Sequence, residues 1–407
     1  MIKIFLPGSK KTKTQLEKSK KVIPYGRQNI SKTDIDTVVE VLNSDFLTQG
    51  PAVPKFEESI STYTGASYGV AVNSATSALH IACLALGLSK GDILWTVPNT
   101  FVASANCALY CGADVDFVDI DPATYNMSVE GLSIKLKSAE KLGKLPKVVI
   151  PVHFAGQPCD MVAIHALSQK YGFKIIEDAS HAIGASYSGI KVGSCQYSDI
   201  TVFSFHPVKI ITTGEGGVAL TNDQSIADRM RRLHTHGITT DHTLMEQRPP
   251  NEIWNYQQIE LGFNYRMTDI QAALGLSQLN RLDEFVTRRH EIAEIYNEQL
   301  SGLPVVTPFQ ELDTYSSYHL YPIRVPENSS PATQKQVYDH LRKNGVGANL
   351  HYIPVHRQPY YEKLGFKSGD FPEAEKFHKE VVSLPMFSDL SSADQNKVIK
   401  VLSEYLI

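Results

Sequence analysis

The sequence lacks the signals of a secreted or membrane-bound protein. Among its 407 residues no apolar run approaches the length of a membrane span, and the N-terminus has no long hydrophobic region of the signal-peptide kind. The five cysteines form no C-x-x-C pair, and their odd number argues against a disulfide framework. We therefore expect a cytoplasmic protein with reduced thiols.

Signals for nucleic acid, dinucleotides and metals are also missing. The formal net charge of −4 provides no overall basic footprint for nucleic acid. No G-x-G-x-x-G follows the first predicted strand, so a dinucleotide-binding fold is not supported. His234 and His236 have a spacing that suits a metal, but no third ligand is apparent in the sequence. We expect no nucleic acid, membrane or metal among the partners.

The composition and the pattern of apolar residues predict a globular α/β protein. Apolar residues make up 42% of the chain, and its length favours two domains. Strands predicted at 68–72, 93–98, 114–119, 148–151, 174–177 and 199–205 alternate with helices at 31–42, 77–86, 100–110, 160–171, 225–233 and 268–282. This alternation predicts a mostly parallel sheet between helices.

The expected domain organisation has three parts. A basic extension occupies residues 1–22 and contributes little to the fold, and a large domain follows at 23–285. A smaller C-terminal α+β domain at 286–407 has predicted strands at 318–325 and 347–351 and a helix at 334–343. Residues 242–255, which are rich in Pro and Gln, are expected to form a long loop that acts as a lid or an interface element.

A turn around Lys209 is the first chemical signal. Residues 203–217 read Phe-Ser-Phe-His-Pro-Val-Lys-Ile-Ile-Thr-Thr-Gly-Glu-Gly-Gly and lie between two strand-like runs. Pro207 fixes one backbone angle and the glycines allow crowded geometry, so the amine of Lys209 is held at a strand end. A held amine can form a Schiff base with an aldehyde cofactor. An ordinary surface lysine is the competing interpretation.

A second motif supplies the partner that such a lysine needs. In Phe-Lys-Ile-Ile-Glu-Asp-Ala-Ser-His-Ala-Ile-Gly at 173–184, Asp178 falls at the carboxyl end of a predicted strand, where open α/β sheets bind ligands. A carboxylate there can keep a pyridine nitrogen protonated, which makes pyridoxal phosphate an electron sink. His181 can donate to the phenolic oxygen of the ring or pack against its face. Taken alone, Asp178 can equally cap a turn.

These motifs, with Asn-Ser-Ala-Thr-Ser-Ala-Leu-His at 73–80 and Gly-Phe-Asn-Tyr-Arg-Met-Thr-Asp-Ile-Gln-Ala-Ala-Leu-Gly at 262–275, resemble those of the DegT/DnrJ/EryC1/StrS sugar aminotransferases. The likeness runs from about Ile23 to the C-terminus. It implies the fold-type I architecture, pyridoxal 5'-phosphate as cofactor, glutamate as amino donor and a homodimer with composite active sites. Phrases at 44–51, 203–209 and 351–356 are most similar to the branch of the family that serves pseudaminic acid biosynthesis.

Small residues at a helix start leave backbone N–H groups open, which makes Ser74, Ala75, Thr76 and Ser77 a candidate phosphate cradle, although a helix N-cap would use the same residues. The resemblance implies further cofactor contacts: Ser204 on the phosphate, Phe101 stacked on the ring, and Asn264 reaching the phosphate in the neighbouring subunit. It also implies a substrate pocket formed by Tyr25, Asp45, Phe46, Leu47, Thr48, Arg266, His351, Tyr352, Ile353 and Pro354.

Structural roles compete with several of these assignments. Phe101, Phe46 and Leu47 can be core residues, residues 351–354 can form a buried edge strand, and Arg266 can form a structural salt bridge. An aminotransferase that uses Lys209 as the proton carrier and aminates a UDP-linked 4-keto-6-deoxy-N-acetylhexosamine is the leading hypothesis. The alternatives are amination of another nucleotide-linked 3- or 4-keto sugar, a dehydrating enzyme in which histidine replaces the lysine, and a non-catalytic cofactor-binding regulator. The presence of Lys209 disfavours the dehydrating enzyme.

Overall fold

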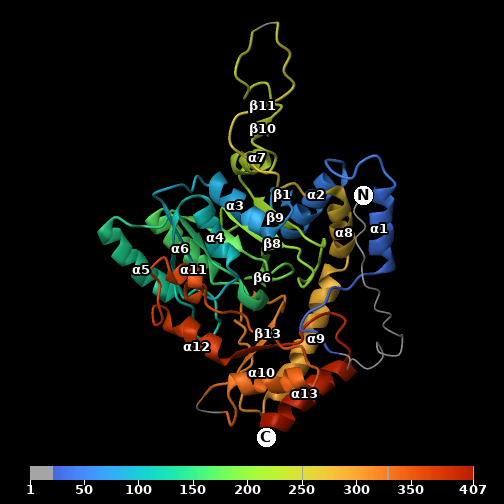
Figure 1. Ribbon diagram of the computed structural model, residues 1–407, viewed down its shortest axis with the longest axis vertical. Coiled ribbons are helices and arrows are strands. Elements are labelled where there is room, and N and C mark those ends of the chain that lie inside the picture. Colours follow the sequence, from blue (N-terminus) through green and yellow to red (C-terminus); the bar gives the residue numbers. More distant parts are fainter. Residues whose placement is uncertain (1–21, 250, 328–329, 407) are drawn as a thin grey trace, which may run out of the picture.

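A computed structural model describes residues 22–249, 251–327 and 330–406, so all but the last residue of the predicted basic extension lies outside the described residues. A seven-stranded sheet runs through the larger part of the molecule, between helices (Figure 1). Its strands, in spatial order, are β1 (Tyr68–Val72), β9 (Gly217–Thr221), β8 (Ile200–Ser204), β5 (Lys174–Asp178), β4 (Val148–Ile150), β2 (Ile93–Thr96) and β3 (Asp114–Phe117).

All strands of this sheet except β9 run in the same direction. Strand β9 pairs antiparallel with both β1 and β8, whereas the pairs from β8 to β3 are parallel. The prediction of a mostly parallel sheet is therefore confirmed. Parallel strands that follow helices end at one edge, and this edge collects the residues that come directly after β1, β2, β4, β5 and β8.

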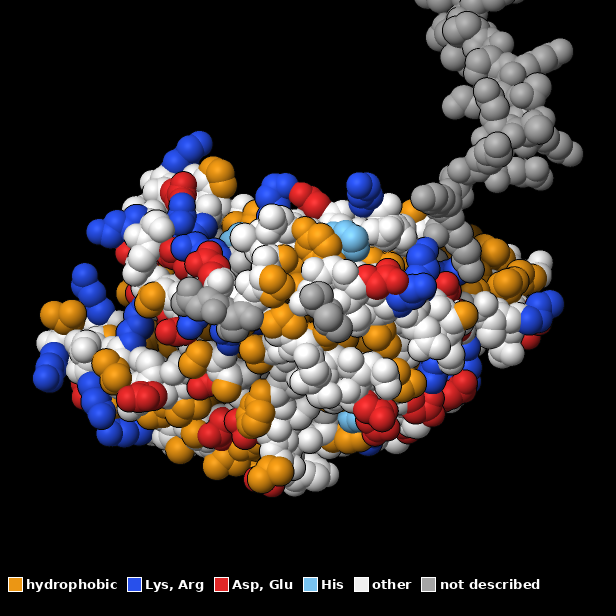
Figure 2. Space-filling model, turned by 90° about the horizontal axis from the view of Figure 1, so that it is seen from below, with side chains coloured by type: hydrophobic (Ala, Val, Ile, Leu, Met, Phe, Trp, Pro, Cys, Tyr) orange, Lys and Arg blue, Asp and Glu red, His pale blue; other side chains and the backbone are white. Residues whose placement is uncertain are grey.

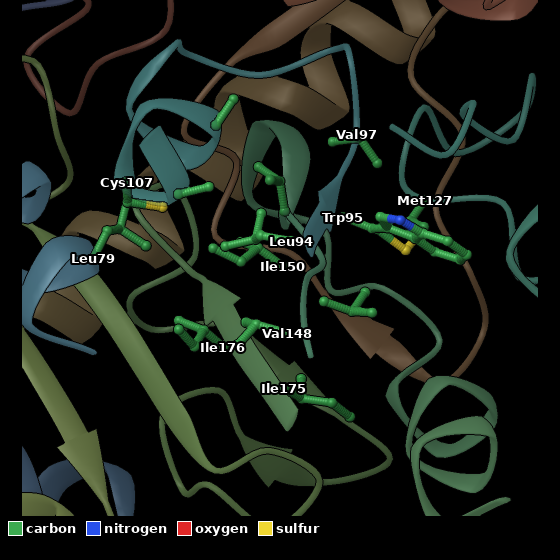
Figure 3. Close-up of a cluster of buried hydrophobic side chains, with 14 of the residues drawn as sticks. Leu79, Leu94, Trp95, Val97, Cys107, Met127, Val148, Ile150, Ile175 and Ile176 are labelled. Carbon is green, nitrogen blue, oxygen red and sulfur yellow. The ribbon is translucent and has the colours of Figure 1, made fainter. Parts of the chain in front are cut away.

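The sheet is covered on both faces because neighbouring strand residues point to opposite sides. On β9, Ala219 packs into one core with α3 (Ala75–Ala85), α4 (Ala103–Tyr110), α5 (Val129–Leu142) and α6 (Met161–Tyr171). Val218 and Leu220 pack into a second core with α2 (Ala52–Thr64) and α8 (Asp269–Leu279). Figure 3 shows part of the first core, where Leu94 and Ile150 from adjacent strands lie close to Ile176 and Val148.

The helix start signals in the sequence are mostly accurate. Helix α1 (Lys32–Leu42) begins after Ser31, which caps it by accepting a hydrogen bond from the N–H of Asp34. Helix α7 (Gln224–Leu233) lies within one residue of its prediction. Helix α3 begins two residues earlier than expected, and α4 begins later, at Ala103, since residues 98–102 turn away from β2 before the helix forms.

A further core lies in the C-terminal part of the chain, at the bottom of Figure 1. The long helix α9 (Leu282–Leu300) leads into it, and β13 (Tyr321–Arg324) pairs antiparallel with β14 (Val381–Leu384). The helices of this part are α10 (Gln334–Lys343), α11 (Pro359–Glu362), α12 (Pro372–Glu380) and α13 (Ser392–Leu406). The predicted boundary at residue 286 falls inside α9 and stays a prediction.

One predicted strand of this part is wrong. Residues 347–351 do not form a strand: the N–H of Gly347 donates to the carbonyl of Ile23, and Asn349 makes a single bridge to Ser383. A Cβ on Gly347 would lie 2.6 Å from the carbonyl oxygen of Ile23, so the segment is held by close single contacts rather than by a ladder.

The described residues of the predicted long loop, 242–249 and 251–255, lie in the hairpin that projects at the top of Figure 1, above β10 (Ile238–Thr239) and β11 (Gln257–Gln258). It carries the almost fully exposed side chain of Ile253. The opposite end, seen in Figure 2, has Lys and Arg side chains interspersed with Asp and Glu. In the described part of the chain, no helix is long and apolar enough to cross a membrane, and no cluster of His, Cys, Asp and Glu suits a metal ion.

Candidate active site

A cavity of about 1030 Å³ opens at the carboxyl edge of the sheet. The ends of β1, β5 and β8 contribute Ser74, Asp178 and Ser204, and the β8–β9 connection contributes Lys209. The C-terminal part closes the cavity with His319 and residues 349–352. Of the predicted site residues, the cavity brings together Tyr25, Ser74, Ala75, Thr76, Ser77, Phe101, Asp178, His181, Ser204, Lys209, His351 and Tyr352.

Lys209 is held by the chain on both sides of it. Strand β8 ends at Ser204, the N–H of Phe205 donates to the carbonyl of Gly216, and the N–H of Lys209 donates to the carbonyl of His206 at 2.9 Å. The side chain is partly buried, and desolvation lowers the pKa of Lys209 to about 8, although the nearby carboxylate of Asp178 raises it. Roughly a tenth of the amines are therefore unprotonated at pH 7.

The carboxylate of Asp178 is fixed by two donors. The hydroxyl of Ser104 donates to Oδ2 at 2.6 Å, and the N–H of Ser180 donates to Oδ1 at 3.1 Å. Because the proton of Ser104 is used in this way, the hydroxyl of Thr100 donates to Ser104 at 2.8 Å. Asp178 thus faces the cavity with a set orientation and with lone pairs left for a further donor.

The start of α3 fits an anion. Ser74 caps the helix by accepting from the N–H of Ser77, while the first-turn N–H groups of Ala75 and Thr76 have no place in the helical ladder. A Cβ on Gly217 would lie 2.6 Å from the nitrogen of Ala75, so only glycine lets β9 approach the helix start this closely. The N-cap and the anion site are therefore compatible uses of the same turn.

His181, His319 and His351 surround Lys209 in neutral form. Burial lowers the pKa of His181 and His319 well below the usual range, and the positive charge of Lys209 acts in the same direction. Burial, followed by Lys209, lowers the pKa of His351 to about 3. The neutral imidazoles add no cationic charge to this wall of the cavity.

Phe101 is 59% exposed and lines the cavity, so the interpretation of Phe101 as a core residue is wrong. Phe46 and Leu47 are also about half exposed, at 51% and 48%, which excludes the core for them. Residues 351–354 do not form the alternative edge strand, since Ile353 is 50% exposed and the segment carries no strand pairing.

The remaining predicted substrate and cofactor residues lie outside this cavity. They are Asp45, Phe46, Leu47, Thr48, Asn264, Arg266, Ile353 and Pro354. The 45–48 segment is tied to the start of α8, where the N–H of Asp269 donates to the carbonyl of Leu47. Asn264 and Arg266 lie in an extended stretch that bridges to Thr235 and Val72. Within the described part of the chain Arg266 forms no salt bridge, so the alternative interpretation of Arg266 as a structural salt-bridge residue has no support.

Several residues that line the cavity or contact its lining were not predicted from the sequence. Ser104 and Thr100 were placed in a helix without a role, although a pair of hydroxyls four residues apart at a helix start points to one spot. His319 and Asn349 lie in irregular segments of the C-terminal part, where no sequence pattern predicts a site residue. Gln271 and Glu215 also line the cavity and contact each other through the side-chain amide of Gln271 and the carbonyl of Glu215, at 2.8 Å.

Comparisons with known proteins place this geometry in a family. Residues 28–403 match the model of the DegT/DnrJ/EryC1/StrS aminotransferase family. The spore coat polysaccharide biosynthesis protein SpsC of Bacillus subtilis is 38% identical over 392 residues, covering 96% of this chain and 98% of that protein. A Campylobacter jejuni protein named UDP-4-amino-4,6-dideoxy-N-acetyl-beta-L-altrosamine transaminase is 36% identical over 388 residues, covering 95% and 98%.

Solved structures agree with the sequence relatives. Helicobacter pylori PseC, described as an aminotransferase involved in the biosynthesis of pseudoaminic acid, superimposes with a TM-score of 0.84 at 31% identity, covering 95% of this chain and 99% of that chain. The putative sugar aminotransferase Spr1654 of Streptococcus pneumoniae, in its PLP form, gives 0.83 at 29% identity, covering 95% and 100%. The chain belongs to the DegT/DnrJ/EryC1/StrS aminotransferase family, whose members are pyridoxal-phosphate-dependent sugar aminotransferases of fold type I.

Proposed function

We propose that this enzyme transfers the amino group of glutamate to the 4-keto carbon of a UDP-linked 4-keto-6-deoxy-N-acetylhexosamine. The product is UDP-4-amino-4,6-dideoxy-N-acetyl-β-L-altrosamine, an intermediate of pseudaminic acid biosynthesis. The observation that carries the aminotransferase chemistry is that Lys209 and Asp178 face one cavity. The substrate is supported by the names of the Campylobacter and Helicobacter relatives. The five free cysteines support a reducing compartment, and we assign the enzyme to the cytoplasm.

The residues at the cavity fit pyridoxal phosphate. The start of α3 and Ser204 would hold the phosphate, Phe101 would cover one face of the ring, and Asp178 would meet the ring nitrogen. The two donors on Asp178 leave the carboxylate free to accept one more hydrogen bond. When bound, the cofactor supplies an electron sink for the carbon that loses or gains a proton.

Lys209 carries the proton in both half-reactions. Its lowered pKa leaves a fraction of unprotonated amine at neutral pH, and this amine can take the proton from the α-carbon of glutamate. In the second half-reaction Nζ delivers a proton to the sugar carbon that receives nitrogen. The histidines beside Lys209 are neutral, so the pKa of the amine is set by burial, which lowers it, and by Asp178, which raises it.

We propose that two copies of the chain build each active site. The 45–48 segment, Asn264 and Arg266 lie outside the cavity of their own chain, and Phe46 and Leu47 expose apolar surface beside them. A second copy would cover this surface and receive Asn264 at its phosphate site. Size-exclusion chromatography with light scattering tests the dimer. Mixing Lys209→Ala and Asn264→Ala chains tests shared sites, because hybrid dimers regain one intact site if Asn264 acts in the neighbour.

The substrate is tested by incubating the purified protein with glutamate and a panel of UDP- and dTDP-linked keto sugars. We expect preferential turnover of the UDP-linked 4-keto-6-deoxy-N-acetylhexosamine, with product stereochemistry read by NMR. The 38% identity to the spore coat polysaccharide protein favours a second candidate, another nucleotide-linked 3- or 4-keto sugar. A preference for a dTDP-linked sugar would select that candidate.

The role of Lys209 is tested by Lys209→Arg. The guanidinium cannot act as the proton carrier at neutral pH, so turnover should vanish while the circular dichroism spectrum is retained. Normal multiple-turnover transamination by this variant would reject the assignment of Lys209 as the proton carrier, whereas a native protein without any transamination would favour the cofactor-binding regulator.

A further inference from the structure

Tyr352 contacts His181 in the wall of the cavity. The hydroxyl of Tyr352 lies 3.2 Å from Nε2 of His181, and both residues line the cavity. His181 is itself fixed on its other side, where the backbone N–H of Ala155 lies 3.3 Å from Nδ1. A backbone N–H can only donate, and this fact sets the direction of the whole chain of hydrogen bonds.

The proton of the neutral His181 ring lies on Nε2. Nδ1 accepts from Ala155, so the single ring proton occupies the other nitrogen, and burial beside Lys209 disfavours a second proton. Nε2–H therefore donates to the oxygen of Tyr352. Burial raises the pKa of Tyr352, with the charge of Asp178 acting in the same direction, so the phenol keeps its proton. That proton must point away from His181.

The ring of His181 has little freedom to reverse this arrangement. The ring of His319 packs against it at a centroid distance of 4.3 Å. The hydroxyl of Ser317 donates to the backbone carbonyl of His181 at 2.7 Å, and the N–H of Ser317 donates to the carbonyl of Gly156. The segment 316–320 thus locks His181 against the turn that carries Ala155.

His351, the neighbour of Tyr352, is already satisfied by the protein. The side-chain amide of Asn349 donates to Nε2 of His351 at 3.2 Å, because the amide oxygen accepts from the N–H of Leu350. Nδ1–H of His351 then donates to the hydroxyl of Ser383 at 2.9 Å. The ring of His351 lines the cavity with both nitrogens already hydrogen-bonded. The hydroxyl of Tyr352, by contrast, has no acceptor within the described part of the chain.

We propose that Tyr352 is a specificity-determining hydrogen-bond donor, oriented by the Ala155–His181 relay toward a lone-pair oxygen of the sugar. This inference rests on the proposed function. A hydroxyl held as a donor favours a substrate with a carbonyl or hydroxyl oxygen at that place and penalises an analogue without it. His181 acts on the sugar only through Tyr352 and is in this respect a positioning residue.

The test compares the holoenzyme with Tyr352→Phe and with the control Tyr315→Phe, whose hydroxyl lies on the 43% exposed side chain of β12 (Thr314–Tyr315). Steady-state constants are measured for the keto sugar and for its deoxy and deoxyfluoro analogues. We expect Tyr352→Phe to raise KM for the sugar about tenfold with a smaller change in kcat. The analogue that lacks the recognised oxygen should bind the native enzyme about tenfold more weakly than the keto sugar does. Tyr352→Phe should bind this analogue and the keto sugar equally, because the variant has already lost the same hydrogen bond.

Two outcomes of the kinetic test overturn the proposal. An unchanged sugar KM in Tyr352→Phe would show that the hydroxyl does not contact the sugar. An equal loss in cofactor affinity and in the glutamate half-reaction would assign the hydroxyl to the cofactor. If the native enzyme fails the glutamate half-reaction, the proposed function fails instead. The relay is then still tested by ¹⁵N NMR of the histidine-labelled apoenzyme, where a proton on Nδ1 of His181 would refute it.

Discussion

The pH dependence of Lys209 gives the sharpest test of the site. The pKa of Lys209 is lowered to about 8 by burial, against an ordinary value near 10.5. At pH 7 the unprotonated fraction is therefore about 300-fold higher than for an exposed lysine. Because only the unprotonated amine attacks an aldehyde, the rate of cofactor capture by the apoenzyme should rise about tenfold per pH unit below pH 8 and level off above it.

The assay is stopped-flow absorbance after mixing apoenzyme with pyridoxal phosphate between pH 6 and 10, with Lys209→Ala as the background. The Asp178→Asn variant tests the direction in which Asp178 shifts the pKa of Lys209. The carboxylate of Asp178 raises the pKa of Lys209, so its removal should move the midpoint to lower pH. A midpoint near 10 in the native apoenzyme, or an upward movement in Asp178→Asn, would refute the account of Lys209 as a desolvated amine beside a carboxylate.

Three further predictions concern the parts around the amine. Gly217→Ala should weaken cofactor binding at least tenfold in equilibrium titrations, because its Cβ would lie 2.6 Å from the nitrogen of Ala75; unchanged affinity would remove the close approach from the phosphate cradle. Asp269→Ala should cost about 2 to 3 kcal/mol in urea unfolding, since the buried carboxylate accepts from the N–H groups of Gly50 and Ala52 at 2.8 Å; a loss below 0.5 kcal/mol, on the order of a neutral surface change, would contradict this. The pKa of His351 is lowered to about 3 in the folded protein, so the unfolded chain binds more protons below pH 6.5. The free energy of unfolding of the apoenzyme should therefore fall as the pH is lowered from 6.5 to 4. A free energy of unfolding that stays constant over this range would exclude a buried neutral imidazole.

The catalytic edge could be predicted from the sequence because each of its residues follows a clear strand. The runs that end at Asp178 and Ser204 are apolar and β-prone, and parallel strands place their carboxyl ends together. Ser74 follows β1 in the same way. Local pattern and a general rule of α/β sheets thus bring these residues to one place without knowledge of any contact.

The polar environment of the same residues was beyond sequence reasoning. The hydroxyl of Ser104 reaches Asp178 from a position 74 residues earlier, and Tyr352 reaches His181 from a position 171 residues later. Neither pairing has a local signature. The predicted strand at 347–351 failed for a related reason: the segment is held by single contacts to residues 23 and 383, which periodicity cannot reveal.

The sheet edge and the C-terminal wall of the cavity are therefore expected to have different roles. The sheet edge carries Lys209 and Asp178, which any aminotransferase of this kind needs, and its geometry follows from strand direction. The C-terminal wall carries His319 and Tyr352 on irregular segments, whose positions depend on hydrogen bonds to the turns after β4 and β5 rather than on a strand of their own. If Tyr352 donates to the sugar as proposed, substitutions on this wall should change which sugar oxygen is recognised without moving the amine. Selectivity among keto sugars is accordingly expected to follow the wall, and the proton transfer to follow the edge.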